Sequence, residues 1–231
     1  MSQSPPSLHL DDVRYRWRGG SAFGLHIRDL TLAPAETVLL LGESGSGKST
    51  VLSLICGTIL ADAGTVCVAG HDIAALPAGK RDRFRAEQIG LIFQQFNLLP
   101  FASVRDNILL PLQFAPQRRA RVPDVAGEAE RLCRDLGLPD GITGAQAGTL
   151  SVGQQQRVAC ARALIGAPPL IIADEPTSAL DAATQTTFLN LLFAQSRAHA
   201  TTLLMVSHDA RLAGQFDRVL HMADIAEMER D

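Results

Sequence analysis

Two kinds of hydrophobic pattern occur along the chain, and they predict two kinds of β-sheet. In Leu8–Trp17 and Phe23–Leu32 the apolar residues fall mostly at alternating positions, and Thr65–Ala69 adds a short strand. Such alternation is typical of antiparallel strands with one solvated face. Other short runs are continuously apolar, as in parallel strands that are buried on both faces. These runs are Val38–Leu41, Leu91–Phe93, Leu170–Ala173 and Leu203–Ser207.

Helical patterns fill the middle of the chain and alternate with its later strands. Ala126–Leu136 has helical spacing and is followed by Gly137 and Pro139, which together form a stop signal. We interpret the stretch from Phe96 to about Gly148 as a helical insertion into an α/β core. After Arg218–Met222 we expect only a short tail and no appended regulatory domain. Further helices are expected at Gln154–Ile165, Ala182–Arg197 and Ala210–Gln215.

Composition adds few constraints. With 231 residues, 46% of them hydrophobic, the chain is large enough for one substantial core. Its net charge of −3 gives no support for a nucleic-acid-binding surface, so no nucleic-acid partner is expected. We interpret the basic clusters Lys80–Arg85 and Arg118–Arg121 as solvated helix faces or loops. The four cysteines have no C-x-x-C pair and are expected to be small buried hydrophobes in a reducing compartment. They are Cys56, Cys67, Cys133 and Cys160.

The N-terminus does not resemble a signal peptide, because Met1–Pro6 is polar and contains prolines. No apolar run approaches the ~18–20 residues that would span a bilayer. We therefore expect a cytoplasmic protein that reaches a membrane only through a partner.

A phosphate-binding pattern, G-x-x-x-x-G-K-[ST], follows the apolar run Val38–Leu41 without a mismatch. Its glycines allow successive backbone N–H groups to turn towards the oxygens of a triphosphate. A helix expected to begin near Lys48 would direct its positive dipole end at the same anion. Lys48 should reach the β- and γ-phosphates, and the Ser49 hydroxyl should ligate Mg²⁺. The run consists of Gly42, Glu43, Ser44, Gly45, Ser46, Gly47, Lys48, Ser49 and Thr50.

Two carboxylates follow the apolar run Leu170–Ala173. Ligands bind outside the carboxyl ends of strands in open α/β sheets, so we expect Asp174 and Glu175 to meet the phosphate loop. Asp174 would hold Mg²⁺, in part through water, because this ion keeps much of its hydration shell. Glu175 would orient or deprotonate the attacking water. The residues together predict hydrolysis of a nucleoside triphosphate.

Four further runs carry a resemblance to the nucleotide-binding domain of ABC transporters. They occur in the order of that family and span most of the chain. Leu150–Arg157 resembles the signature motif, Asp174–Asp181 the Walker B and D-loop run, Leu91–Pro100 the Q-loop, and Ser207–Asp209 the H-switch.

The resemblance implies a single domain over residues 1–231, of α/β class with a P-loop NTPase fold. A mainly parallel sheet flanked by helices would form a RecA-like core, together with a small antiparallel β-subdomain, over about 8–95 and 158–231. An inserted α-helical subdomain would occupy about 96–157.

The resemblance also implies the roles of individual residues towards ATP and Mg²⁺. Trp17 lies where the family has an aromatic residue that stacks on adenine, and Tyr15 is the alternative. Gln94 should contact Mg²⁺ and the attacking water, and relay the nucleotide state to the helical region. His208 should contact the γ-phosphate and the catalytic carboxylate Glu175.

The family implies a composite active site in a homodimer. Ser151 and Gly153 of one copy would close over ATP held by Lys48 of the other, while Gln154 helps to start the signature helix. Asp181 would lie across the same isologous interface. ATP would thus join the two copies, and hydrolysis would release them.

The signature departs from the family pattern at Val152, where the first glycine commonly stands. A β-branched residue adopts a positive φ only at a cost, and its side chain is stiff. We predict a working ATPase whose dimer closes less tightly.

The surroundings of the Q-loop indicate the kind of ABC protein. Phe96–Phe101 and Val104–Leu112 are rich in apolar residues, which would form a groove for a membrane permease, fill the helical subdomain's own core, or both. The sequences of these runs resemble those of the lipoprotein-releasing and macrolide-export type of ABC ATPase. This resemblance implies a place on the cytoplasmic face of the inner membrane. An amino-acid-type importer ATPase and a soluble, non-transport ABC ATPase are the alternatives. A regulatory subunit without turnover is disfavoured by Glu175 and His208.

Overall fold

The computed structural model describes residues 5–17, 23–178 and 180–230. The polar residues Met1–Ser4 and Ala179 of the Walker B and D-loop run therefore lie outside the described residues. The chain folds into two compact units. The first consists of Met1–Arg85 and Thr202–Asp231, and the second of Ala86–Thr201.

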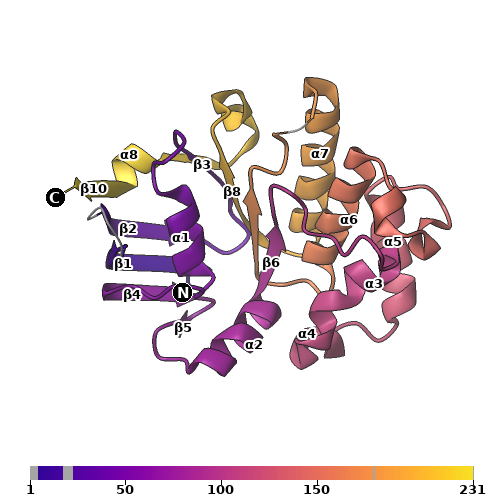
Figure 1. Ribbon diagram of the computed structural model, residues 1–231, viewed down its shortest axis with the longest axis horizontal. Coiled ribbons are helices and arrows are strands. Elements are labelled where there is room, and N and C mark those ends of the chain that lie inside the picture. Colours follow the sequence, from indigo (N-terminus) through magenta and orange to yellow (C-terminus); the bar gives the residue numbers. More distant parts are fainter. Residues whose placement is uncertain (1–4, 18–22, 179, 231) are drawn as a thin grey trace, which may run out of the picture. The chain divides into compact units, whose positions relative to one another are not determined.

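An antiparallel sheet forms much of the first unit, with the strand order β10-β2-β1-β4-β5 (Figure 1). In β1 the apolar residues Leu8, Leu10 and Val13 are fully buried between more exposed neighbours, as the alternation predicts. The alternation slips by one residue at Asp12, which has φ +45° and lies where the pairing of β1 with β4 shifts register. The strands are β1 (Leu8–Arg16), β2 (Phe23–Leu32), β4 (Ala63–Val68), β5 (His71–Asp72) and β10 (Ala226–Arg230).

The last residues of the chain form more than the expected tail. After the short helix α8 (Met222–Ile225), β10 pairs antiparallel with β2, from Ala226 opposite Ile27 onwards. The prediction was wrong here because β10 is short and carries charged residues such as Glu227, so no clear apolar alternation marks it.

Parallel strands form the rest of the first unit's sheet structure. β3 (Thr37–Leu41) pairs in parallel with both β8 (Thr202–Ser207) and β9 (Arg218–His221). Every residue of β3 and β8 is buried, which confirms that these apolar runs are strands buried on both faces. Helix α1 (Lys48–Ile55) follows β3 and contacts β4. The helix expected at Ala210–Gln215 is present as a 3₁₀-helix.

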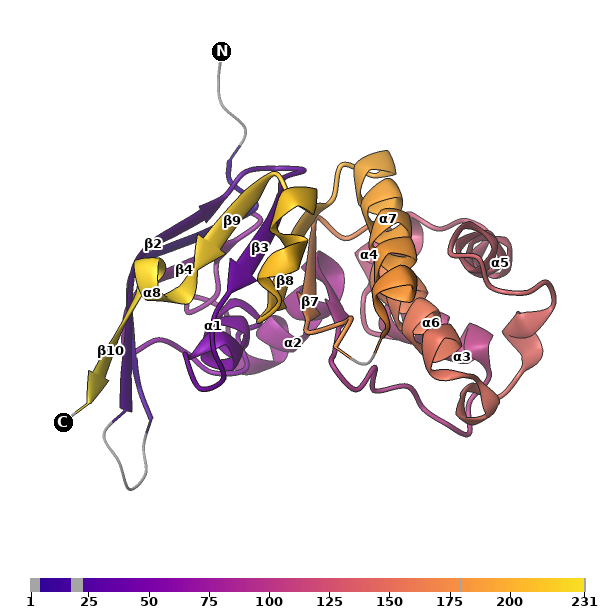
Figure 2. The ribbon, with the colours of Figure 1, turned by 90° about the horizontal axis from the view of Figure 1, so that it is seen from above.

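The second unit contains a parallel pair of strands and most of the helices (Figure 2). Strand β6 (Ile89–Ile92) pairs in parallel with β7 (Leu170–Asp174). Helix α6 (Val152–Leu164) contacts β6 and also α3, α5 and α7, so it is the central helix of this unit. The remaining helices are α3 (Val104–Leu109), α4 (Pro116–Ala120), α5 (Val125–Asp135) and α7 (Ala182–Ala198).

The two basic clusters differ in the exposure of their side chains. Lys80–Arg85 lies on α2 (Ala78–Gln88) with exposed or half-exposed side chains, as predicted. In the other cluster, Arg118 is only 1% exposed, so the interpretation of Arg118–Arg121 as a solvated face was wrong for this residue. The cysteines are free, and all except the half-buried Cys67 are buried. Among the described residues, no helix is apolar over a length that would cross a bilayer.

Candidate functional site

The phosphate-binding run forms a tight loop between β3 and α1. Gly45 and Gly47 have φ values of +79° and +93°, a conformation that residues with a side chain rarely adopt. A Cβ atom at Gly47 would also lie 3.0 Å from Cδ1 of Leu25. Helix α1 begins at Lys48, where the sequence predicted it, and has no acidic residue in its first turn. The positive end of α1 is therefore available to an anion.

The polar groups of the loop suit a phosphate ligand. The Nζ atom of Lys48 donates hydrogen bonds to the carbonyl oxygens of Gly42, at 2.5 Å, and Glu43, at 2.7 Å. These bonds hold the ammonium group over the loop, where it can donate a hydrogen bond to a phosphate oxygen. The hydroxyl of Ser46 is buried and, among the described residues, has no hydrogen-bond partner. Ser49 is exposed in the first turn of α1.

His208 lies close to the loop in the same unit. Strand β8 ends at Ser207, whose carbonyl oxygen accepts a hydrogen bond from the backbone N–H of Gly42 at 3.3 Å. His208 is the next residue, and its side chain is exposed. The structure therefore brings the predicted H-switch next to the start of the phosphate loop.

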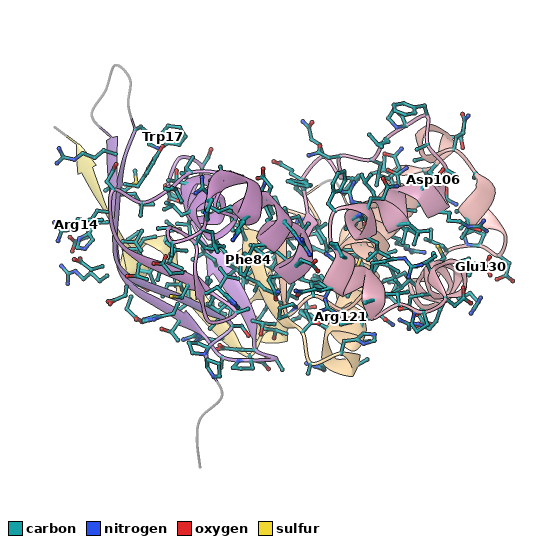
Figure 3. The ribbon with its side chains drawn as sticks, turned by 90° about the horizontal axis from the view of Figure 1, so that it is seen from below. Arg14, Trp17, Phe84, Asp106, Arg121 and Glu130 are labelled. Atoms are coloured by element: carbon teal, nitrogen blue, oxygen red, sulfur yellow. The ribbon has the colours of Figure 1, made fainter. Side chains whose placement is uncertain are left out.

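The two candidate adenine-stacking residues lie at the end of β1, where Figure 3 shows the side chain of Trp17. Their rings are in edge contact, with centroids 5.5 Å apart, and Trp17 is 48% exposed. Tyr15 pairs with Leu25, the residue that approaches Gly47, and both line a cleft of about 490 Å³. The choice between the two aromatic residues stays a prediction.

The acidic residues lie at the end of β7 in the second unit. Asp174 is the last residue of this strand, and Glu175 follows it with a φ of +45°. The described residues contain no group of three or more His, Cys, Asp or Glu side chains that could hold a metal ion by themselves. Mg²⁺ commonly uses one or two carboxylates together with water and substrate phosphates. The oxygen donors of Ser49, Gln94 and Asp174 are of the kind that this ion prefers.

The Q-loop is held in an uncommon conformation. Gln94 is exposed just after β6, while Phe96 and Asn97 have φ values of +59° and +48°. The guanidinium of Arg162, from α6, donates hydrogen bonds to the carbonyl oxygens of these two residues, at 2.5 and 2.6 Å. The sequence analysis assigned no role to Arg162. The sequence signal that could have identified Arg162 is a charged residue within the largely apolar C-terminal part of a helix.

The signature residues begin α6. Ser151 is the N-cap, and it forms a capping box with Gln154. The Ser151 hydroxyl accepts from the Gln154 N–H at 3.3 Å, and the Ser151 N–H donates to Oε1 of Gln154 at 3.0 Å. A Cβ atom at Gly153 would meet nothing within 4 Å, so this face of the helix is open. Ser151 and Gly153 therefore lie at an accessible, positively polarised helix end.

Val152 is accommodated without the backbone strain that its β-branched side chain would cause at a positive φ. It is the first residue of α6 and is not among the residues with positive φ. Its side chain is 52% exposed beside Ser151. Any effect of Val152 must therefore come from the volume of this side chain at a surface.

We predict that Val152→Gly strengthens ATP-dependent dimerisation about tenfold in a Glu175→Gln background, because it removes a side chain from the predicted dimer interface. Sedimentation equilibrium with ATP and Mg²⁺ would measure the dimer dissociation constant. An unchanged constant would show that Val152 does not hinder closure.

Asp181 is the N-cap of α7. Its carboxylate accepts hydrogen bonds from the N–H groups of Ala183 and Thr184, at 3.1 and 3.0 Å, and from the Thr184 hydroxyl. The bonds from Thr184 lower the pKa of Asp181. This capping role was not anticipated, and the predicted place of Asp181 at a dimer interface stays a prediction.

Comparisons with known proteins agree with this arrangement of motifs. The family described as ABC transporter matches residues 25–178. The lipoprotein-releasing system ATP-binding protein LolD of Anaeromyxobacter dehalogenans is 42% identical over 95% of this chain and 91% of its own. The macrolide export ATP-binding/permease protein MacB of Rhodopirellula baltica is 39% identical over 84% of this chain, which spans 28% of that longer protein.

A solved structure extends the likeness to the whole fold. The dimeric ATP-binding cassette MJ0796, in a post-hydrolysis state bound to ADP and Pi, has a TM-score of 0.81 and 31% identity to this chain. The likeness covers 96% of this chain and 98% of the cassette. The predicted P-loop NTPase fold is confirmed by this likeness. The chain therefore belongs to the ABC transporter family, as an ATP-binding ATPase.

Proposed function

We propose that this ATPase works as a homodimer and drives an integral-membrane permease of the export, lipoprotein-releasing type. Its place would be the cytoplasmic face of the inner membrane. The observation that carries the proposal is the 42% identity to a lipoprotein-releasing ATP-binding protein over 95% of the chain. A likeness that is spread over almost the whole length includes the partner-facing segments as well as the nucleotide motifs.

The proposed chemistry uses the residues of the predicted motifs. Trp17, or Tyr15, stacks on adenine, and the loop Gly42–Thr50 binds the phosphates through its N–H groups and Lys48. Ser49, Asp174 and Gln94 hold Mg²⁺, which neutralises charge on the phosphates when it is bound.

Hydrolysis requires a group that takes a proton from water. Glu175 is the general base in this proposal, and Gln94 orients the attacking water. His208 contacts the γ-phosphate and the carboxylate of Glu175, so it senses whether the phosphate is present.

The dimer couples ATP binding to movement. Ser151 and Gly153 of one copy contact the γ-phosphate of ATP that is bound by Lys48 of the other copy. The open face of α6 at Gly153 and the lack of an acidic residue in the first turn of this helix support this role. Because only the closed dimer makes these contacts, ATP favours closure and hydrolysis reverses it.

An exposed apolar surface, made by the Q-loop region and the start of the predicted helical insertion, supports a permease partner. Phe101 is 75% exposed, and Phe93 and Leu99 are also exposed, whereas Val104 and Ile108 are buried in the unit's own core. The buried side chain of Asn107 accepts a hydrogen bond from the Leu99 N–H at 2.7 Å and donates to the carbonyl oxygens of Leu99 and Ser103, both at 3.0 Å. The exposed side chains are therefore presented on a fixed backbone, as a docking surface requires.

A pull-down tests the proposal. Tagged Glu175→Gln protein with ATP and Mg²⁺ is expected to capture a permease with few spans and a large extracytoplasmic domain from solubilised native membranes. Adding Phe101→Ser should lose the permease while ATP-dependent dimerisation remains, and adding Lys48→Ala should lose both. A many-span permease with a periplasmic binding protein would indicate an importer. A ribosomal or DNA-repair partner would overturn the transporter proposal.

A further inference from the structure

The loop that carries Glu175 has a conformation that its surroundings must maintain. It joins β7 to α7, and Glu175 itself lies in the left-handed region with a φ of +45°. For a residue with a side chain, this conformation is uncommon and costs free energy unless neighbouring contacts hold it. The carboxylate direction therefore depends on what fixes the following peptides.

Two hydrogen bonds from the side chains of flanking helices hold this loop. The side-chain amide of Gln156, on α6, donates a hydrogen bond to the carbonyl oxygen of Pro176 at 2.7 Å. The amide of Gln185, on α7, donates to the hydroxyl oxygen of Thr177 at 2.9 Å. Gln156 is 1% exposed, so water does not compete for its bond, while the bond from Gln185 to Thr177, which is 3% exposed, is partly buried. We name Gln156 and Gln185 the glutamine clamp.

Burying the amide of Gln156 at a core position costs folding free energy. Its Oε1 atom is buried and, within the described part of the chain, has no hydrogen-bond partner. A buried acceptor without a partner destabilises the fold, whereas an apolar side chain of the same shape would not. Packing alone therefore does not account for a glutamine at this position, and its donor group is the part that makes a contact.

We propose that Gln156 is a positioning residue for hydrolysis, which holds the Pro176 carbonyl so that the Glu175 carboxylate faces the attacking water. Gln185 acts in the same way through its bond to the Thr177 hydroxyl. The inference rests on the proposed role of Glu175 as general base. Because Ser151 is the N-cap of α6, one helix carries both the signature end and the group that sets the position of the carboxylate.

Steady-state ATPase assays on the purified chain test the clamp. Gln156→Met keeps the volume but removes the donor, and we expect kcat to fall about tenfold while KM for ATP changes less than twofold. Gln185→Met should give a smaller fall of the same kind. Gln195→Met is the matched control, since this amide lies further along α7 and bonds to Asp135 at 3.3 Å. The control should leave kcat unchanged.

The Glu175→Gln background separates positioning from general damage. If the clamp acts through the carboxylate, Gln156→Met should lower neither the residual turnover of Glu175→Gln nor its ATP-dependent dimerisation. A further loss in this background, or a wild-type kcat in Gln156→Met, would overturn the inference. Full turnover in Glu175→Gln alone would overturn both the proposed role of Glu175 as general base and the proposed role of the glutamine clamp. A fall of kcat in Glu175→Gln without a fall in Gln156→Met would overturn only the proposed role of the glutamine clamp.

Discussion

A Glu175→Gln variant is expected to bind ATP as the wild type does and to hydrolyse it at least about 100-fold more slowly. The amide matches the carboxylate in shape but cannot accept a proton from water. Its backbone keeps the left-handed conformation of the wild type, because the loop is held by the hydrogen bonds from Gln156 to Pro176 and from Gln185 to Thr177. Release of phosphate under saturating ATP and Mg²⁺ would measure the effect.

The same variant should accumulate as an ATP-bound dimer, because closure is retained while the reaction that reverses it is blocked. Size-exclusion chromatography with ATP and Mg²⁺ would detect the dimer. A Lys48→Ala variant is the control that should stay monomeric, since it lacks the cation that binds the phosphates. If Glu175→Gln keeps more than about a tenth of wild-type kcat, another group is the base and Glu175 only assists.

Much of the fold follows from local patterns along the chain. Buried parallel strands such as β3 and β8 have continuous apolar runs, and the phosphate loop needs glycines where φ is positive. Both signals lie within a few residues, so they can be recognised without knowing the tertiary structure. The placement of His208 beside the phosphate loop follows from the parallel pairing of β3 with β8.

Other features depend on contacts between distant residues and left no clear local signal. Strand β10 carries charged residues and is defined by its pairing with β2. Gln156 and Arg162 belong to a helix that contacts three others, and only the fold shows that each bonds to a loop with positive φ. Tertiary context decides such roles. The capping role of Asp181 is different, because its bonds to Ala183 and Thr184 are local and an Asp directly before the expected helix is an N-cap signal that the sequence analysis did not use.

Arg118 differs most from its prediction, because we expected a solvated side chain and the structure places it in the core of the second unit, where its guanidinium forms hydrogen bonds. All N–H donors of its guanidinium are used: Nε to Ile165 at 2.5 Å, Nη1 to Ala86 and Ile89, and Nη2 to Arg162 and Ala163, all at carbonyl oxygens. Several of these oxygens belong to the end of α6, where helix carbonyls lack partners.

The charge of Arg118 is retained in this buried position. Burial, and to a lesser extent the charge of Arg121, lower its pKa to about 9, while Glu87 opposes the shift. This value still leaves the guanidinium protonated at neutral pH. Glu87 also accepts hydrogen bonds from the backbone N–H groups of Gln117, at 3.0 Å, and Arg118, at 2.7 Å. Arg118 thus connects α4, the end of α6 and the start of β6.

An Arg118→Leu variant is therefore expected to lose about 3–5 kcal/mol of folding free energy, because several buried carbonyl oxygens lose their donor at once. At about 2–4 °C for each kcal/mol in a chain of this size, the melting temperature should fall by roughly 10 °C. Arg121→Leu is the matched control (Figure 3), since Arg121 is exposed and donates one bond, to Gly166 at 2.9 Å. It should lower the melting temperature by less than about 3 °C. Equal effects of the two substitutions, measured by differential scanning calorimetry, would show that the buried hydrogen bonds of Arg118 do not stabilise the end of α6.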